Sequence, residues 1–309
     1  MTRRLSGLGA ACVLAGLALA PRPAAAYVRY LTQTGMPFYW PQTCVPLTAY
    51  PKDLTDMTPD QILTAALGAA DAWGPDANTC SYLDIQLYMS TDTTPDAKYD
   101  QRNSLIFRHD SWCRWDDPPG TCSYDQSALA ITSVFVTLDG KIRDGDIEVN
   151  AKYFVWTDVL ADPNPEGKQD LQNALTHEMG HLIGLDHTCI SAGGPSTDQY
   201  GHPLVDNTGA PVPECSMASQ AIKDTTMYPS ATPGDTSKRT LSTDDAQAVC
   251  DIYPVAMNPN LCPGPAVPSS SGCSTAPIPP AGSGGLGLVG IAIACLLRAG
   301  WRRRARARS

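Results

Sequence analysis

The stretch HEMGHLIGLDH, residues 177–187, constrains this chain more than any other part of its sequence. His177 and His181 are four residues apart, so on a helix they lie on one face, one turn from each other. Gly184 follows three residues later, and glycine readily adopts the left-handed conformation that ends a helix. The chain can then turn back and bring His187 beside the other two rings. The spacing therefore predicts a helix, a glycine turn and three converging imidazoles.

Three neutral imidazoles with an open fourth position are the coordination expected of a catalytic zinc site. We therefore predict that His177, His181 and His187 bind one zinc ion. Glu178 lies beside the first ligand on a neighbouring face of the helix, where it can approach the open position without being a ligand. It is the predicted general base, which takes a proton from water and passes it to a departing amine. A core or surface role for the histidines would leave the glycine and the third spacing unexplained.

The periodicity of the rest of the chain predicts an α+β fold, with strands first and then helix, loop and helix. Helices are predicted over residues 58–73, over 170–183, and from Ser242 to Pro254, where Ser242 and Asp245 resemble a capping box. Residues 189–240 are rich in Gly, Pro, Ser and Thr and predict an ordered loop. Four segments predict strands: 82–89, 103–109, 127–138 and 146–156.

The pattern H-E-x-x-H-x-x-G-x-x-H is the metzincin metalloprotease signature, and HEMGHLIGLDH resembles in particular the zinc site of matrixins. Metzincins have a methionine turn beneath the zinc. TTMYPS places Met227 in the matrixin order Met-Tyr-Pro, which the rival Met217 in CSMASQ lacks. LSTDDAQAVCDIYP is similar to the matrixin closing helix, while LAIT and GDIEVN are weaker echoes of the upper edge strand and the strand after it.

The resemblance covers roughly residues 27–254. It implies a zincin fold, with a twisted mixed sheet, an active-site helix and a smaller C-terminal subdomain ending in a helix. It also implies a zinc endopeptidase that hydrolyses protein or peptide substrates, with Met227 as structural support beneath the metal. In the family, extended substrates pair with the edge strand as an added strand. We expect a monomer.

The chain departs from matrixins between the third histidine and the methionine turn. About forty residues separate His187 from Met227, much more than is usual, and Cys189 and Cys215 could staple this insertion, 188–226. It would border the pocket for the residue after the scissile bond, so matrixin substrate preferences should not be carried over. The role of the insertion stays open.

Two further matrixin features are missing. No room remains for a propeptide after Ala26, and there is no cysteine-switch motif; Cys44 as a zinc-blocking thiol would leave an odd number of cysteines. The calcium and structural-zinc loops are not evident either. Calcium could bind at Asp139, Asp144 and Asp146, although a solvated acidic turn is the simpler interpretation, and we expect His109 and His202 to be ordinary loop residues.

Both ends of the chain resemble export signals. Residues 1–26 have a basic start, an apolar stretch and a small-residue cleavage site, as in a secretory signal peptide. The domain at 27–255 is followed by a Pro/Ser-rich linker, 256–272. The tail, 273–309, combines a motif at Cys273, an apolar run shorter than the roughly 20 residues that span a bilayer, and an arginine cluster.

This order resembles the C-terminal sorting tails of myxobacterial-type surface proteins. In that class the tail is removed and the cysteine becomes the attachment point, so Cys273 would carry the anchor. The alternative is a weak permanent transmembrane helix, held by the arginines. Either way we expect an exported protein, anchored at the bacterial surface or secreted, that meets a membrane only through this tail.

Charge and cysteine content agree with export. The two ends hold nine arginines and no acid, so the part between them has 13 basic and 31 acidic residues, a formal net charge of −18. This argues against nucleic acid or anionic membrane as a partner. Eight cysteines remain for disulfides, with 105 pairings open. Proximity in sequence suggests Cys113–Cys122, Cys189–Cys215, Cys250–Cys262 and Cys44–Cys80.

A second function class stays open. The chain could be a surface-displayed adhesion or binding protein that keeps the zincin scaffold and cleaves little or nothing. Loss of Glu178 or of a histidine would have favoured that hypothesis, and neither is lost. A peptidase of narrow specificity, with the long loop as a recognition arm, lies between the two.

Overall fold

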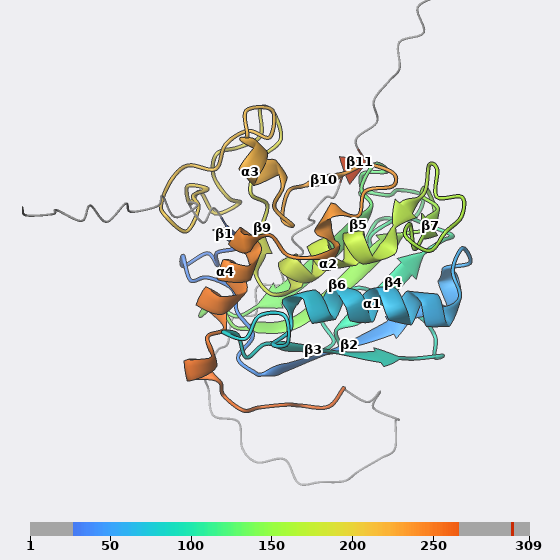
Figure 1. Cartoon of the computed structure of the whole chain (residues 1–309), viewed down its shortest axis with the longest axis horizontal. Coiled ribbons are helices and arrows are strands. Elements are labelled where there is room, and N and C mark those ends of the chain that lie inside the picture. The colour runs from blue at the N-terminus through green and yellow to red at the C-terminus, as the bar shows by residue number, and fades with distance from the viewer. Residues whose placement is uncertain (1–26, 266–297, 300–309) are drawn as a thin grey trace, which may run out of the picture.

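A computed structural model describes residues 27–265 and 298–299; the predicted signal peptide and the motif at Cys273 lie outside the described residues. Its centre is a five-stranded sheet in the order β3-β2-β4-β6-β5 (Figure 1). Neighbouring strands run parallel except at β5, an antiparallel edge strand. The expectation of an α+β fold with a mixed sheet is confirmed. The strands are β2 (Cys44–Tyr50), β3 (Asp84–Met89), β4 (Ser104–Arg108), β5 (Ala130–Val136) and β6 (Ile142–Asn150).

Two helices, α1 (Pro59–Trp73) and α2 (Leu171–Leu182), lie side by side on one face of this sheet (Figure 1). α1 begins as predicted, because Thr58 and Gln61 form a complete capping box. α2 packs so closely on β6 that a Cβ added to Gly145 would lie 2.4 Å from Leu182 Cδ1. The opposite face of the sheet is covered by loops, in which Trp112 and Tyr124 form a small second cluster with Ile131 of β5.

The last helix, α4 (Thr243–Ile252), has the predicted N-cap at Ser242. The predicted capping box is only half present, however. The Asp245 carboxylate accepts from Thr226 N at 2.6 Å and from Ser242 Oγ at 2.6 Å, so it ties the helix to the preceding loop. The remaining elements are short: β1 (Val28–Arg29), η1 (Pro51–Asp53), β7 (Trp156–Thr157), β8 (Gln169–Asp170), β9 (Leu185–Asp186), α3 (Gln220–Lys223), β10 (Ser230–Ala231), η2 (Ser237–Arg239), η3 (Val255–Met257) and β11 (Arg298–Ala299).

Strand β2 was not predicted, because Pro46 falls within it and proline cannot donate to a sheet ladder. The structure tolerates the proline because β4 pairs with β2 only from Thr48 onwards. The side-chain amide of Asn103, just before β4, donates instead to the Pro46 carbonyl at 2.7 Å.

The eight domain cysteines form four disulfides, as the even count predicted. Cys113–Cys122 and Cys189–Cys215 are confirmed, but the other two predicted pairs are wrong: Cys44 bonds to Cys262 and Cys80 to Cys250. Proximity in sequence fails here because the chain returns to its beginning after α4.

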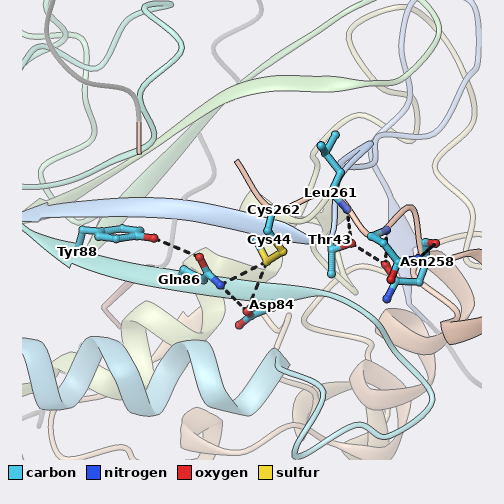
Figure 2. The surroundings of a disulfide bond; sticks show 9 residues. Thr43, Cys44, Asp84, Gln86, Tyr88, Asn258, Leu261 and Cys262 are labelled. Atoms are coloured by element: carbon cyan, nitrogen blue, oxygen red, sulfur yellow. Dashed lines mark hydrogen bonds between the residues drawn. A yellow bond between two sulfur atoms is a disulfide. The ribbon is translucent and has the colours of Figure 1, made fainter. Parts of the chain in front are cut away.

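Figure 2 shows this return around Cys44. The backbone nitrogens of Thr43 and Cys44 donate to the Leu261 carbonyl, and Thr43 Oγ1 donates to Asn258 Oδ1 at 2.6 Å. These bonds hold the segment after α4 against the start of the inner strand β2. Among the described residues, no helix is both long enough and apolar enough to cross a membrane.

We predict that the disulfide between the segment after α1 and helix α4 carries much of the domain's stability. Replacing both cysteines, Cys80→Ala/Cys250→Ala, opens a link across 170 residues and should lower the free energy of unfolding by about 2–5 kcal/mol. The matched control is Cys113→Ala/Cys122→Ala, whose link spans 9 residues and should cost less. Denaturant titration measures both, and equal losses would contradict the expectation.

Candidate metal centre

Helix α2 is fixed at both ends, and this fixes the residues that it carries. Asp170 caps its start by accepting from Asn173 N at 2.8 Å. Near its end, Trp40 Nε1 donates to the Leu182 carbonyl at 2.9 Å, and the Tyr253 hydroxyl donates to the Ile183 carbonyl at 2.8 Å. Carbonyls that a helix end leaves without partners are therefore bound by side chains from distant parts of the chain.

The chain turns back directly after the helix, at Gly184. This residue has φ +99°, and an added Cβ would lie 2.6 Å from the Phe38 carbonyl oxygen. Conformation and space both require glycine there. β9 follows and pairs with β1, and His187 comes next in the chain. The turn predicted from the motif is confirmed.

The three histidines converge on one point. The Nε2 atom of His177 lies 3.1 Å from that of His181, and both lie 3.2 Å from Nε2 of His187. Zinc with bonds of about 2.0–2.1 Å in a tetrahedron holds its nitrogen ligands about 3.3–3.4 Å apart. The separations therefore fit three corners of such a site and leave the fourth open.

The opposite ring nitrogens are used to orient two of the rings. Nδ1 of His177 lies 2.7 Å from the Thr226 carbonyl oxygen, and Nδ1 of His181 lies 2.8 Å from that of Leu185. A carbonyl only accepts, so in both rings the proton is on Nδ1 and the Nε2 lone pair faces the centre. Contacts of this kind are typical around metal-binding histidines.

Burial keeps the rings neutral. It lowers the pKa of His177 and His187 well below the ordinary value, and lowers that of His181 to about 3. Nearby Lys238 lowers all three further. Neutral imidazole is the form that binds a metal.

Glu178, the residue after His177 on α2, is fully buried. Its Oε2 accepts from Thr132 Oγ1 of β5 at 2.6 Å, whereas Oε1 has no hydrogen-bond partner among the described residues. Burial raises the pKa of Glu178 to about 8, and the Thr132 hydrogen bond and Lys238 oppose this rise. A buried carboxyl oxygen without a partner costs stability, so the arrangement suits a group that exchanges a proton with something bound at the centre.

Met227 lies fully buried against α2, whereas its rival Met217 is 80% exposed. A Cβ on Gly180 would lie 2.2 Å from Met227 Sδ, so only glycine lets the methionine approach the helix this closely. The residue before it, Thr226, offers its carbonyl to His177, and its nitrogen donates to Asp245 of α4. A continuous set of contacts therefore runs from α4 through the methionine turn to the first histidine.

Three further residues lie around this centre, and no sequence motif indicates a role for them. Thr132 lay in the LAIT segment, but nothing in the sequence showed that it faces Glu178. Tyr30 places its hydroxyl 3.3 Å from His181 Nδ1. Lys238 is buried, its Nζ donates to the Tyr228 carbonyl, and burial lowers its pKa to about 7.

The structure also tests the expectations for His109, His202 and Cys44. His109 and His202 lie outside the cluster, where each pairs with a neighbouring aspartate. Cys44 is bonded to Cys262, so it is not a zinc-blocking thiol.

The expectation that Asp139, Asp144 and Asp146 form a solvated acidic turn is wrong for two of the three. Asp139 is exposed and pairs with Lys141, but Asp144 and Asp146 on β6 are 0% and 1% exposed. Asp144 Oδ2 accepts from Asp100 N and Gln101 N, and Asp146 Oδ1 accepts from Ser104 N. Their other oxygens have no partner among the described residues. Alternation along the strand turns both carboxylates to the face away from α2.

Among the described residues, His177, His181 and His187 are the one group of three or more metal-binding side chains that could share an ion. No protein-family model and no curated protein sequence matches the chain. The geometry of the centre and its motif therefore carry the functional argument.

The buried pair on β6 predicts a pH-dependent stability. Burial raises the pKa of Asp144 to about 7 and raises that of Asp146 as well, above the ordinary value of about 4. The folded protein then holds protons that the unfolded chain has lost. This stabilisation is full below about pH 4 and is lost as the pH rises through 7.

Asp144→Asn retains an oxygen that can accept from Asp100 N and Gln101 N but cannot ionise. In chelator, its free energy of unfolding should fall less between pH 5 and 8 than that of the parent protein. Denaturant titrations at several pH values measure this. Equal falls would show that the Asp144 carboxyl does not titrate as described.

Proposed function

We propose that this chain is a zinc-dependent endopeptidase of the matrixin type, acting on extracellular proteins or peptides. One observation carries the proposal: the Nε2 atoms of three histidines, two of them buried and one half-buried, face one another at 3.1–3.2 Å, and the adjacent Glu178 has a buried carboxyl oxygen with no partner among the described residues. The Nε2 lone pairs of His177 and His181 are directed at this point, and they repel each other unless a cation or a donated proton lies between them. The metzincin motif and the buried Met227 support the same proposal.

The residues present have separate tasks in this reaction. Zinc, when bound, would supply a Lewis acid that polarises a carbonyl and lowers the pKa of water. Glu178 would accept a proton on its free Oε1 and deliver it to the leaving amine. Thr132 holds the other oxygen at 2.6 Å and so fixes the carboxylate's orientation. Full burial of Glu178 favours its protonated form, which suits a base that must later act as an acid.

The alternative proposal is a binding or adhesion protein on the same scaffold. It would account for bound metal, but it gives no task to Glu178. An unpartnered buried carboxyl oxygen destabilises a protein that only binds. We therefore favour the peptidase.

We propose export and surface display as the setting of this activity. Four disulfides suit an oxidising compartment. Anchoring through Cys273, as the resemblance of the tail implies, is part of the same proposal.

We also propose that calcium can take the place of the protons held by Asp144 and Asp146. Each has one buried oxygen with no partner among the described residues, and oxygen is the ligand that calcium prefers. Asp139 is not included, because its carboxylate is paired with Lys141 at the surface.

Removal of the proposed base tests the function directly. Glu178→Ala should retain one equivalent of zinc, since Glu178 is not a ligand, and should lower kcat by at least about 10²-fold. The assay is hydrolysis of a fluorescence-quenched peptide library, with zinc content measured in parallel. A chelator should abolish the parent activity, and zinc should restore it.

Thr132→Val is the matched conservative variant. It removes one hydroxyl next to Glu178 and should lower kcat about tenfold, leaving zinc content unchanged. Zinc bound at one equivalent, with no peptide or protein cut by the parent protein, would favour the binding protein. Cleavage that survives Glu178→Ala would contradict the assigned role.

A further inference from the structure

A cleft opens beside His187, between the N-terminal strand and the insertion at 188–226. Its volume is about 950 Å³, at the upper end of the range for ligand pockets and more than one side chain fills. Tyr30 and Asp186 line it near the metal centre, and Leu204 and Val212 line it within the insertion. A chain bound across the metal centre could therefore extend into this cleft on one side of the cleaved bond.

The insertion is a closed structure with its own internal bonds. Cys189–Cys215 closes residues 189–215 of this part of the chain into a loop, and beside this disulfide Ile190 N donates to the Pro213 carbonyl and Cys215 N to the Ile190 carbonyl. Further along, Leu204 N donates to the Ser196 carbonyl and Val212 N to the Leu204 carbonyl, both at 2.9–3.0 Å. This wall of the cleft is therefore formed before any ligand binds.

The insertion is also attached to the opposite wall. Val28 of β1 pairs with Asp186 of β9 on one side and forms a bridge to Asp206 of the insertion on the other. Asn207 N donates to the Tyr27 carbonyl at 3.0 Å. The cleft thus has a continuous backbone frame that runs from the insertion through β1 to the residue before His187.

The cleft is lined by apolar side chains and by carboxylates. Ile190, Leu204 and Val212 contribute apolar surface, and the carboxylates are those of Asp186, Asp198 and Asp206. Among the described residues that line the cleft, the one lysine or arginine is Arg29, whose Nη2 donates to the Phe38 carbonyl.

Two of the carboxylates are held in place by backbone nitrogens of the insertion. Asp198 Oδ1 accepts from Tyr200 N and His202 N, and Asp206 Oδ1 accepts from Thr208 N and Ala210 N. Asp198 Oδ2 also contacts the ring of His202, and the Thr208 hydroxyl donates to Asp206 Oδ1.

We infer that this cleft binds a cationic segment of the substrate polypeptide, so that the enzyme selects cleavage sites flanked on one side by lysine or arginine. Long basic side chains match such a lining, because their apolar stems can lie against aliphatic residues and their charged ends can reach carboxylates. The net charge of −18 on the part of the chain between the two ends also attracts cationic peptides, over a longer range. The inference rests on the proposed peptidase function and names its substrate class.

The test separates binding from cleavage. Zinc-loaded Glu178→Ala protein is titrated with a dye-labelled peptide that carries three arginines, and with the same peptide carrying three glutamates. The parent enzyme is then assayed on quenched peptides that have arginine, glutamine or glutamate on either side of a common cleavage site. We expect tighter binding of the arginine peptide, and a kcat/KM at least about fivefold higher for arginine than for glutamate on one side only.

Asp198→Asn/Asp206→Asn removes two charges and keeps the oxygens that bind the loop nitrogens. It should reduce the arginine preference about fivefold and leave kcat/KM for the glutamine peptide within about twofold. The control, Asp71→Asn/Glu166→Gln, removes two exposed acids that do not line the cleft and should keep the preference.

The outcomes distinguish the claim of a cationic-peptide cleft from the claim of peptidase activity. Tighter binding of the arginine peptide without cleavage by the parent enzyme would support the cleft and overturn the peptidase. Cleavage with no preference for arginine, or a preference that the control pair removes equally, would overturn the cationic cleft and leave the peptidase standing.

Discussion

The structure depends on the convergence of three neutral imidazoles in a buried site. The Nε2 lone pairs of His177 and His181 face each other at 3.1 Å, an arrangement that a cation bound between the three rings would stabilise. The surrounding fold holds them there nevertheless. Gly184 permits the turn that returns His187, and Gly180 permits the approach of Met227. The turn at Met227 in turn supplies the Thr226 carbonyl that orients His177.

Rigidity around α2 explains how this geometry can persist without help from a ligand. Trp40, Trp73 and Tyr253 bind carbonyls of the helix from three separate parts of the chain. Disulfides then tie the last helix to the region after α1, and the end of the domain to the start of β2. Ligands fixed in advance lose little conformational entropy when a metal binds, which favours tight metal binding.

The centre could be predicted from sequence because its residues lie close together in the chain and obey helical spacing. His177, His181 and Gly184 needed no information about the rest of the fold. Contacts from distant segments could not be found in this way: Thr132 reaches Glu178 across 46 residues, and Asp245 reaches Thr226 across 19. The disulfides show the same limit. Cys113–Cys122 closes a short loop, whereas Cys44–Cys262 depends on where the chain returns after α4. The burial of Asp144 and Asp146 could not be predicted either, because it depends on the loops that cover them.

The central claim is that His177, His181 and His187 hold one zinc ion through Nε2. Zinc-edge X-ray absorption on protein purified with zinc measures this coordination directly. We predict one equivalent of zinc with three imidazole nitrogens at about 2.0–2.1 Å and one further oxygen ligand. Sulfur in the first shell, or loss of zinc during purification with the three histidines intact, would contradict it.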